Sequence, residues 1–228
     1  SLEYYLPRYG MASFNWYKKD IRDFFSTLNT VADATLLDSL GLPRDLVGYQ
    51  YSTRVNVSDA MIKGWEASLN LPLANISAFM PTGGLDSWLR PYSVMINQTH
   101  LELSGSRITA ADWKRYIPRS RNFGLRFSYP RLSGNLLLNW KGRMLRDTSS
   151  LINGVSSGGA EYIRSRYQLD GNVDFQLTPR WALYVAGRNL LDSSTEWEVT
   201  GPGAATYAAM TNYERYGVQY SLGIRGSF

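Results

Sequence analysis

The chain has 228 residues, of which 44% are hydrophobic, 14% aromatic and 19% charged. Its formal net charge is +5 and its basic residues are mostly single arginines, so the sequence predicts no nucleic-acid-binding surface. Cysteine is absent, which excludes disulfide frameworks and thiolate metal sites, and no stretch approaches the roughly 20 apolar residues of a membrane helix.

The chain opens on residues that already read as part of a strand. Ser1–Leu6 carries tyrosines and leucines, without the basic, apolar and small-residue regions of a signal peptide. We therefore expect that the sequence begins inside a domain and lacks an N-terminal part. After a turn near Pro7, the side chains of Ala12, Phe14 and Trp16 alternate with polar ones, and this period of two predicts a second strand.

A long connection and a long strand are expected next. Asp23–Gly48 is predicted to be a loop, in which Thr35–Pro43 indicates a short helix that ends at Gly41. The stretch from about Tyr49 to Leu71 predicts a long strand.

The long strand has one irregular position. Lys63 shares the parity of Trp65, so it faces lipid if Trp65 does, unless a bulge intervenes or the position lies above the membrane. A weaker strand follows from about Tyr92 to Leu103, and its alternation is blurred.

Two hairpins and a terminal strand with clean alternation follow. Each hairpin has a short turn between two alternating segments, which is the pattern of paired antiparallel strands. The segments are Phe123–Tyr129 with Leu136–Met144, Tyr167–Leu177 with Trp181–Arg188, and the terminal Tyr216–Phe228.

Short turns alternate with long connections along the chain. The turns lie near Pro7, Ser133 and Pro179, and this alternation is typical of a membrane barrel with brief periplasmic turns and extended outer loops. A soluble β-sandwich is the alternative, but its loops have similar lengths at both ends. The long connection Pro72–Pro91 breaks the pattern, because it should lie on the short side. The other long connections are Asp23–Gly48, Gly105–Arg119, Asp147–Arg164 and Asp192–Tyr213.

Four stretches, in the same order along the chain, resemble TonB-dependent outer-membrane receptors. The C-terminal half is similar to the end of that family's barrel, with the strand that closes on Leu177-Thr178 and the "Asn-Leu-Leu-Asp" stretch that follows. Ser58 stands where the family commonly has a glycine. The four stretches are Tyr17–Phe24, Val55–Glu66, Gln168–Thr178 with Gly187–Asp192, and Tyr213–Gly217 before the terminal strand.

The resemblance implies an all-β fold. Residues 1–228 would be the C-terminal part of an antiparallel up-and-down transmembrane β-barrel, about nine of its roughly 22 strands, with the plug domain absent. It places the protein in the outer membrane of a Gram-negative bacterium, in contact with outer-membrane lipid. The receptor would import a scarce nutrient such as a siderophore-iron chelate, a cobalamin-like ligand or a glycan, with energy from the TonB complex acting on the missing plug.

The same resemblance implies no enzymatic activity, and we expect no cofactor, no metal site and no nucleic-acid partner. The sequence does not select one ligand from the three classes. Two alternatives stay open: a complete small outer-membrane barrel with a structural or hydrolase role, and a soluble β-sandwich binding module.

The terminal strand suggests a signal for membrane assembly. In outer-membrane proteins, the barrel-assembly machinery recognises a C-terminal aromatic residue that follows alternating apolar residues. Under the alternative, this is an ordinary edge strand. The residues that match the signal are Tyr220, Leu222, Ile224 and Phe228.

A set of basic residues falls on the polar parity of the predicted strands. Inside a barrel they are candidates for a lumen or ligand path, and they would pair with plug carboxylates or attract an anionic ligand. The simpler interpretation is that they are solvated lumen residues, paired with each other and with Asp170 and Asp174. The set consists of Arg126, Lys141, Arg143, Arg188 and Arg225.

His100 is the only histidine, and it lies close in sequence to Glu102, Ser104 and Ser106. A hydrolase needs a base, a nucleophile and an orienting carboxylate held together, and only proximity suggests that here, so we interpret His100 as a lumen or loop residue. Aromatic residues of the long connections are candidates for ligand contact, although interface anchoring explains them equally well. They are Trp113, Tyr116, Tyr162, Trp197, Tyr207 and Tyr213.

Overall fold

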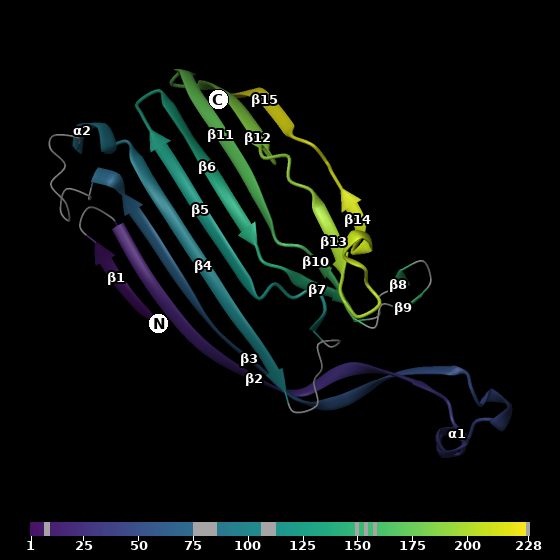
Figure 1. The fold of residues 1–228 in the computed structure, drawn as a ribbon. Helices are drawn as coiled ribbons and strands as arrows, with labels where there is room; N and C mark the ends of the chain where they lie inside the picture. Colours follow the sequence, from purple (N-terminus) through teal and green to yellow (C-terminus); the bar gives the residue numbers. More distant parts are fainter. Residues whose placement is uncertain are drawn as a thin grey trace. The chain divides into compact units, whose positions relative to one another are not determined.

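The computed structural model describes residues 1–6, 10–74, 86–105, 113–148, 151–152, 155–156 and 159–226 (Figure 1). The strands are β1 (Leu2–Leu6), β2 (Gly10–Val31), β3 (Gln50–Pro72), β4 (Tyr92–Gly105), β5 (Arg119–Ser128), β6 (Leu132–Lys141), β7 (Met144–Asp147), β8 (Leu151–Ile152), β9 (Val155–Ser156), β10 (Glu161–Ile163), β11 (Arg166–Thr178), β12 (Trp181–Arg188), β13 (Thr195–Val199), β14 (Met210–Glu214) and β15 (Gln219–Gly226). The helices are α1 (Ala34–Leu40), η2 (Arg44–Leu46), α2 (Asp86–Leu89) and η5 (Thr206–Ala208).

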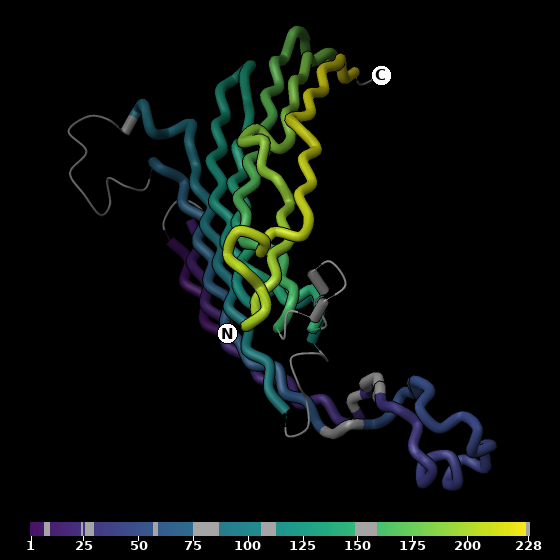
Figure 2. The backbone as a smooth tube through the Cα atoms, turned by 45° about the vertical axis from the view of Figure 1, so that its right-hand side comes forward, coloured from purple at the N-terminus to yellow at the C-terminus, as the bar shows by residue number. Residues whose placement is uncertain are grey.

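Nine strands form one sheet, which we call the large sheet. Its order is β1-β2-β3-β4-β5-β6-β11-β12-β15, and the pairs from β4 to β15 are antiparallel throughout. The first strand (purple) and the last (yellow) lie at its two edges (Figures 1 and 2). The prediction of an all-β fold with about nine antiparallel strands is therefore confirmed.

By its internal contacts the chain divides into two compact units. One comprises Ser1–Tyr17, Lys63–Glu102 and Lys114–Phe228, and the other comprises Lys18–Ile62 and Leu103–Trp113. Strands β2 and β3 pass through both units. The second unit contains their distal halves with α1 and η2, and the first contains the rest of the large sheet.

The hairpin of the second unit corrects one prediction and confirms another. Asp23–Gly48 is not a loop throughout, because β2 continues to Val31 and β3 begins at Gln50. Backbone hydrogen bonds hold this end together, with the Ala32 N–H donating to the carbonyl of Tyr49 at 2.8 Å. They need no apolar alternation, which is why the sequence pattern did not reveal the extension.

The predicted short helix is present as α1. The carboxylate of Asp33 accepts a hydrogen bond from the N–H of Leu36 at 2.7 Å, which caps the first turn. Gly41 ends the helix at φ 67°, in the left-handed region that favours glycine. Arg44 donates two hydrogen bonds, at 3.0 and 2.7 Å, to the carboxylate of Asp38.

Two of the predicted long loops contain a second sheet, which we call the loop sheet. Strands β7, β10, β13 and β14 pair in the order β14-β13-β10-β7. They follow or precede β6, β11, β12 and β15 in the chain, and those four strands stand in the corresponding order in the large sheet. The prediction of Asp147–Arg164 and Asp192–Tyr213 as loops is therefore wrong in part, since both contain strands of the loop sheet.

The two sheets are separated by a strand break, which comprises residues 142–143, 164–165, 189–194 and 215–218. Asn189 has φ 54°, Asp192 φ 50° and Gly217 φ 74°, so the backbone leaves the extended conformation within the break. The Asn189 side chain donates to the carbonyls of Ser193 at 3.2 Å and Gly217 at 3.1 Å, and accepts from the Ser193 N–H at 2.9 Å. This one amide satisfies backbone groups that the interrupted ladders leave free.

The register gives the large sheet one apolar and one polar face. Cross-strand partners share a face. One row of partners is Tyr92, Phe127, Gly134, Val173, Val185 and Leu222, and the next row is Ser93, Arg126, Asn135, Asn172, Ala186 and Ser221.

The apolar face is open to the surroundings, as expected for a lipid-facing surface. Six of its apolar side chains in β5, β6, β11 and β12 are exposed, whereas Leu125, Leu138 and Trp140 are half-buried. A water-soluble monomer rarely exposes so large an apolar surface. The exposed six are Phe123, Leu136, Val173, Phe175, Leu183 and Val185.

Aromatic side chains border the apolar face at both of its ends. At the turn end, where β5 meets β6, Tyr129 packs edge-on against Tyr92 with ring centroids 6.1 Å apart. At the loop end, the ring centroids of Trp140 and Tyr167 lie 6.4 Å apart. From Leu132 to Trp140 the strand extends roughly 27 Å at about 3.4 Å per residue. This matches the roughly 25 Å apolar band of membrane barrels with its aromatic girdles.

None of the helices in the described part of the chain is long and apolar enough to cross a membrane. Several sequence predictions fall wholly or partly outside the described residues. They concern the turn near Pro7, the connection Pro72–Pro91, of which the structure describes residues 72–74 and 86–91 with α2, parts of the connections Gly105–Arg119 and Asp147–Arg164, the residue Ser106 and the terminal Phe228.

Candidate functional site

The polar face of the large sheet carries a row of side-chain amides. Asn97 pairs in register with Asn122, Asn122 with Asn139, and Asn139 with Gln168, so carboxamides cross four adjacent strands at one level. Each amide offers both hydrogen-bond donors and acceptors. The polar face therefore has the capacity to bind a polar surface, such as another domain or a hydrophilic ligand.

Three of the five predicted path residues remain unpaired on this face. Arg126, Lys141 and Arg188 form no ion pair with any residue that the structure describes, and all three are exposed. Arg126 stands opposite Asn135, and Arg188 stands opposite Gln219. These cations are available to an anionic partner.

The other two predicted path residues are held in ion pairs. Arg225 lies 3.1 Å from the carboxylate of Asp174 and over the ring of Tyr184. Arg143 lies 2.6 Å from the carboxylate of Glu198 and over the Tyr162 ring, with its guanidinium carbon 3.7 Å from the ring centroid. Pairing of such a residue with Asp174, which the sequence suggested, is thus observed for Arg225.

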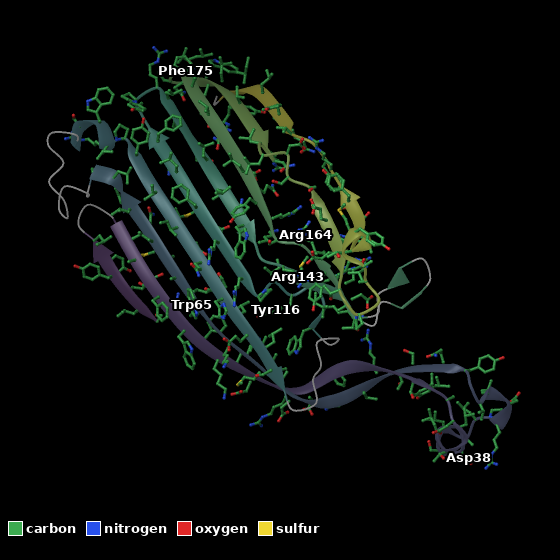
Figure 3. The ribbon with its side chains drawn as sticks, viewed as in Figure 1. Asp38, Trp65, Tyr116, Arg143, Arg164 and Phe175 are labelled. Carbon is green, nitrogen blue, oxygen red and sulfur yellow. The ribbon has the colours of Figure 1, made fainter. Side chains whose placement is uncertain are left out.

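Arginines form ion pairs with the glutamates of the loop sheet, and Figure 3 labels two of these arginines, Arg143 and Arg164. Glu161, a buried residue, pairs with Arg146 and accepts a hydrogen bond from the Thr211 hydroxyl at 2.7 Å. Arg146 also covers the ring of Trp197, with 3.8 Å between the guanidinium carbon and the ring centroid. Because both charges of the buried pair have partners, these contacts fix the packing of β7 on β10 and β13.

Two further carboxylates of the loop sheet, Glu196 and Glu198, form ion pairs of their own. Arg164 lies 2.6 Å from Glu196 and 3.1 Å from Glu198, so Glu198 joins Arg143 and Arg164. Hydrogen bonds from Ser194 and Arg164 hold the pKa of Glu196 below its usual value. The carboxylate of Glu196 is therefore ionised at neutral pH.

Several predicted ligand-contact aromatics have structural roles. Tyr162 and Trp197 lie beneath Arg143 and Arg146, as described above. Tyr116 is half-buried, and burial raises the pKa of its phenol to about 12, so it stays protonated. Tyr207 and Tyr213 are exposed, at 95% and 53% of their surface, and are open to a ligand.

Two cavities lie at the strand break. One of about 460 Å³ is lined by His100, Arg119, Trp140, Gly142 and Ser165, among others. The second, of about 420 Å³, is lined by residues of the breaks around Ser165 and Ser193. Both are open at the surface.

The structure gives His100 a packing role. Its ring stacks on Trp65 with 5.9 Å between centroids, and Nε2 lies 3.3 Å from the Glu102 carboxylate. Ser104 follows on β4, and Ser106 lies outside the described residues. No group of three or more metal-ligating side chains forms within the described ranges.

The terminal stripe occupies the apolar parity of β15. Ile224 pairs in register with Leu183, and Leu222 pairs with Val185. Tyr220, Leu222 and Ile224 are all exposed at the sheet edge. Their role in assembly stays a prediction, since Phe228 lies outside the described residues.

A sheet with an apolar face between two aromatic borders and with amides and cations on its other face is a segment of transmembrane β-barrel wall. Residues 1–222 match the family model of the TonB dependent receptor-like β-barrel. The chain belongs to this family of TonB-dependent receptor β-barrels. A comparison with curated proteins finds no match.

Solved structures with the same fold are receptors and transporters. One is the ferric enterobactin receptor PfeA from Pseudomonas aeruginosa in complex with enterobactin, at 14% identity and TM-score 0.60 over 96% of this chain and 29% of that one. Others are the copper transporter OprC, at 16% identity and TM-score 0.56 over 96% and 28%, and the siderophore receptor PirA from Acinetobacter baumannii, at 18% identity and TM-score 0.55 over 96% and 30%. The chain spans less than a third of the length of each.

Sequence reasoning missed the loop sheet and its ion pairs. Strands β7, β10 and β13 have three to five residues each, which is too short for alternation to stand out. The usable signal was the spacing of glutamates at 196 and 198, which lie on one face of a strand and face Arg164.

Proposed function

We propose that this chain forms the C-terminal part of the barrel wall of a TonB-dependent receptor in the outer membrane of a Gram-negative bacterium, and that the full-length protein imports a scarce nutrient. The observation that carries the proposal is the pair of opposite faces of the large sheet. The apolar face suits lipid, and the amide row with its unpaired cations suits a hydrophilic lumen.

Among nutrients, the charges favour an anionic iron chelate of the siderophore type. Arg126, Lys141 and Arg188 are exposed cations without carboxylate partners in the described part of the chain. A neutral glycan or a cobalamin-like ligand would use the amide row and would not need these cations. The similar structures include a ferric enterobactin receptor and a siderophore receptor, which supports the same class of ligand.

The other proposed partners are the TonB complex, a plug domain and the barrel-assembly machinery. The TonB complex of the inner membrane would act on a plug domain outside residues 1–228, and the polar face would contact that plug. The barrel-assembly machinery would insert the protein through the stripe that ends at Phe228. We assign no catalytic role to the protein.

The test is uptake of radioactive ferric catecholate by cells that express the full-length protein, and by cells in which its gene is deleted. We expect uptake to depend on the gene and to fall several-fold in the R126Q/K141Q/R188Q variant, at an unchanged level in the outer membrane. R180Q, which changes an exposed arginine of the β11–β12 turn, is the control and should transport normally. If deletion instead removes uptake of cobalamin or of an oligosaccharide while ferric catecholate uptake persists, the chelate assignment is wrong.

A further inference from the structure

The loop end of the apolar face carries positive charge where a plain lipid-facing surface would carry none. Arg119 pairs in register with His100, and Arg121 with Trp140, so both arginines lie on the apolar parity of β5. Both are exposed. This is the level of the aromatic border, where a barrel leaves the hydrocarbon and meets lipid headgroups.

Neither arginine is neutralised by the protein. Arg121 packs over the Trp140 ring, with 5.0 Å from the guanidinium carbon to the ring centroid, and it remains exposed. No carboxylate pairs with Arg119 or Arg121 in the parts of the chain that the structure describes. Two other arginines at this end of the sheet, Arg143 and Arg164 of the strand break, are matched with glutamates of the loop sheet.

The carboxylate that lines a cavity together with Arg119 is already matched. Glu102 lines the same cavity as Arg119, but it lies 2.9 Å from the Lys63 ammonium and 3.3 Å from His100. Three formal positive charges, on Lys63, Arg119 and Arg121, therefore meet one negative charge. The irregular position of Lys63 on the parity of Trp65 belongs to this cationic group, at the loop end of the apolar face.

One member of the cationic group, Arg119, lines a cavity whose wall also contains residues on the apolar parity. The cavity of about 460 Å³ has His100, Arg119, Trp140 and Gly142 in its wall. Gly142 leaves this space open, because a Cβ there would lie 2.9 Å from the Arg119 carbonyl and 3.5 Å from the Trp140 ring. Arg119 and Arg121 are two residues apart on one face of a strand, roughly 7 Å, which allows both guanidinium groups to reach one phosphate.

We propose that Arg119 and Arg121, with Lys63 beside them, bind the phosphate of a phosphorylated lipid of the outer leaflet whose acyl chains lie along the apolar face. The charge complementarity selects the headgroup, and the continuous apolar surface below it selects a lipid over a soluble anion. The inference rests on the proposed membrane location. It does not depend on which nutrient the receptor imports.

The experiment is native mass spectrometry of the purified full-length protein in detergent, titrated with bis-phosphorylated lipid A. We expect R119Q/R121Q to weaken binding at least about tenfold, as the loss of hydrogen bonds between charged groups implies. R126Q removes an exposed arginine from the same strand but on the polar face, and should change binding by less than about twofold. R119K/R121K keeps the charges and should restore most of the binding.

Two further ligands test whether the protein recognises the lipid phosphate itself. Dephosphorylated lipid A should bind the unmodified protein as weakly as the phosphorylated lipid binds R119Q/R121Q, and inorganic phosphate at the same concentration should not compete. Equal weakening by R126Q and R119Q/R121Q, equal binding of the dephosphorylated lipid, or competition by inorganic phosphate would each overturn the proposal. Heat-modifiable gel mobility checks that every variant is folded. If R119Q/R121Q does not fold, the comparison of R119K/R121K with the unmodified protein tests the proposal instead. The lipid titration contains no nutrient. A failed uptake assay therefore contradicts only the proposed function, and a failed lipid titration contradicts only the lipid site.

Discussion

The side-chain amide of Asn189, at the end of β12, donates a hydrogen bond of 3.1 Å to the carbonyl of Gly217, just before β15 begins. The two residues are 28 positions apart, and both have positive φ. Asn189 belongs to the "Asn-Leu-Leu-Asp" stretch that resembles the family's barrel. The hydrogen bond explains what that motif does here: it joins two strands of the large sheet at the point where their ladder stops.

We expect Asn189→Ala to destabilise the strand break by about 2–3 kcal/mol. Its side chain makes three hydrogen bonds worth about 0.5–1.5 kcal/mol each. Asn189→Gly should cost about 1 kcal/mol less than the alanine variant, because glycine adopts positive φ freely. Hydrogen exchange at the Ser193 amide measures the effect, and Asn172→Ala, which removes a single contact with Asp174, is the control. Equal exchange in all three variants would show that Asn189 does not hold the break.

Two ion pairs of the loop-sheet glutamates, Arg146 with Glu161 and Arg164 with Glu196, should differ in strength. Arg146→Met leaves the buried Glu161 without its cation, and we expect a loss of about 3 kcal/mol in local stability. Arg164→Met breaks a pair whose arginine is half exposed, and should cost less than about 1 kcal/mol. Hydrogen exchange of the β10 and β13 amides reports both, and a larger effect from Arg164→Met would contradict the buried-pair interpretation.

The loop sheet and the strand break should resist mild acid. Hydrogen bonds from Ser194 and Arg164 lower the pKa of Glu196, and a hydrogen bond from Arg215 lowers the pKa of Asp192. A lowered pKa means that the stabilisation is complete above the unfolded value, about 4.3 for Glu and about 3.9 for Asp, and is lost as pH falls through the folded value. Protection factors of the β13 amides should therefore stay constant from neutral pH to about pH 5 and decline only below about pH 4. A decline already between pH 7 and 5 would point to a different group.

The large sheet was predictable because its information is local. Alternation in β5, β6, β11, β12 and β15 marks both faces, and the register places partners such as Phe123 and Leu138 on one of them. The alternation of apolar and polar residues in β4 is irregular because Gln98 and His100 stand on the apolar parity at the loop end. The register places them beside Arg121 and Arg119.

The loop sheet was not predictable for the opposite reason. Its stability comes from ion pairs between residues far apart in sequence, such as Arg143 with Glu198. Among the candidate path residues, sequence parity placed the cations on the polar face but did not show which have partners. Arg225 and Arg143 are paired, whereas Arg126, Lys141 and Arg188 are not, among the residues described.

A cross-strand glycine makes room for an aromatic ring on the apolar face. Gly134 pairs in register with Phe127, and a Cβ at Gly134 would lie 2.7 Å from that ring and 2.5 Å from the Asn172 carbonyl. We expect Gly134→Val to destabilise the barrel by about 1–3 kcal/mol through overpacking. The combined variant F127A/G134V should recover part of the loss, as measured by thermal unfolding in detergent. If F127A/G134V is no more stable than Gly134→Val, the contact with the Asn172 carbonyl alone causes the loss of stability.

The terminal Phe228 tests whether the apolar stripe of β15 is more than a lipid-facing surface. Loss of one aromatic side chain from lipid costs roughly 1.5–3 kcal/mol, which a large barrel tolerates. If the barrel-assembly machinery reads Phe228 after Tyr220, Leu222 and Ile224, deletion of Phe228 should instead slow insertion and lower the amount of full-length protein in the outer membrane well beyond that loss. Phe123→Ala is the matched control, because Phe123 is an exposed aromatic residue of the apolar face within the sheet. The measurement is the outer-membrane level of the protein over time after induction, and equal accumulation of the two variants would reduce Phe228 to one more lipid-facing side chain.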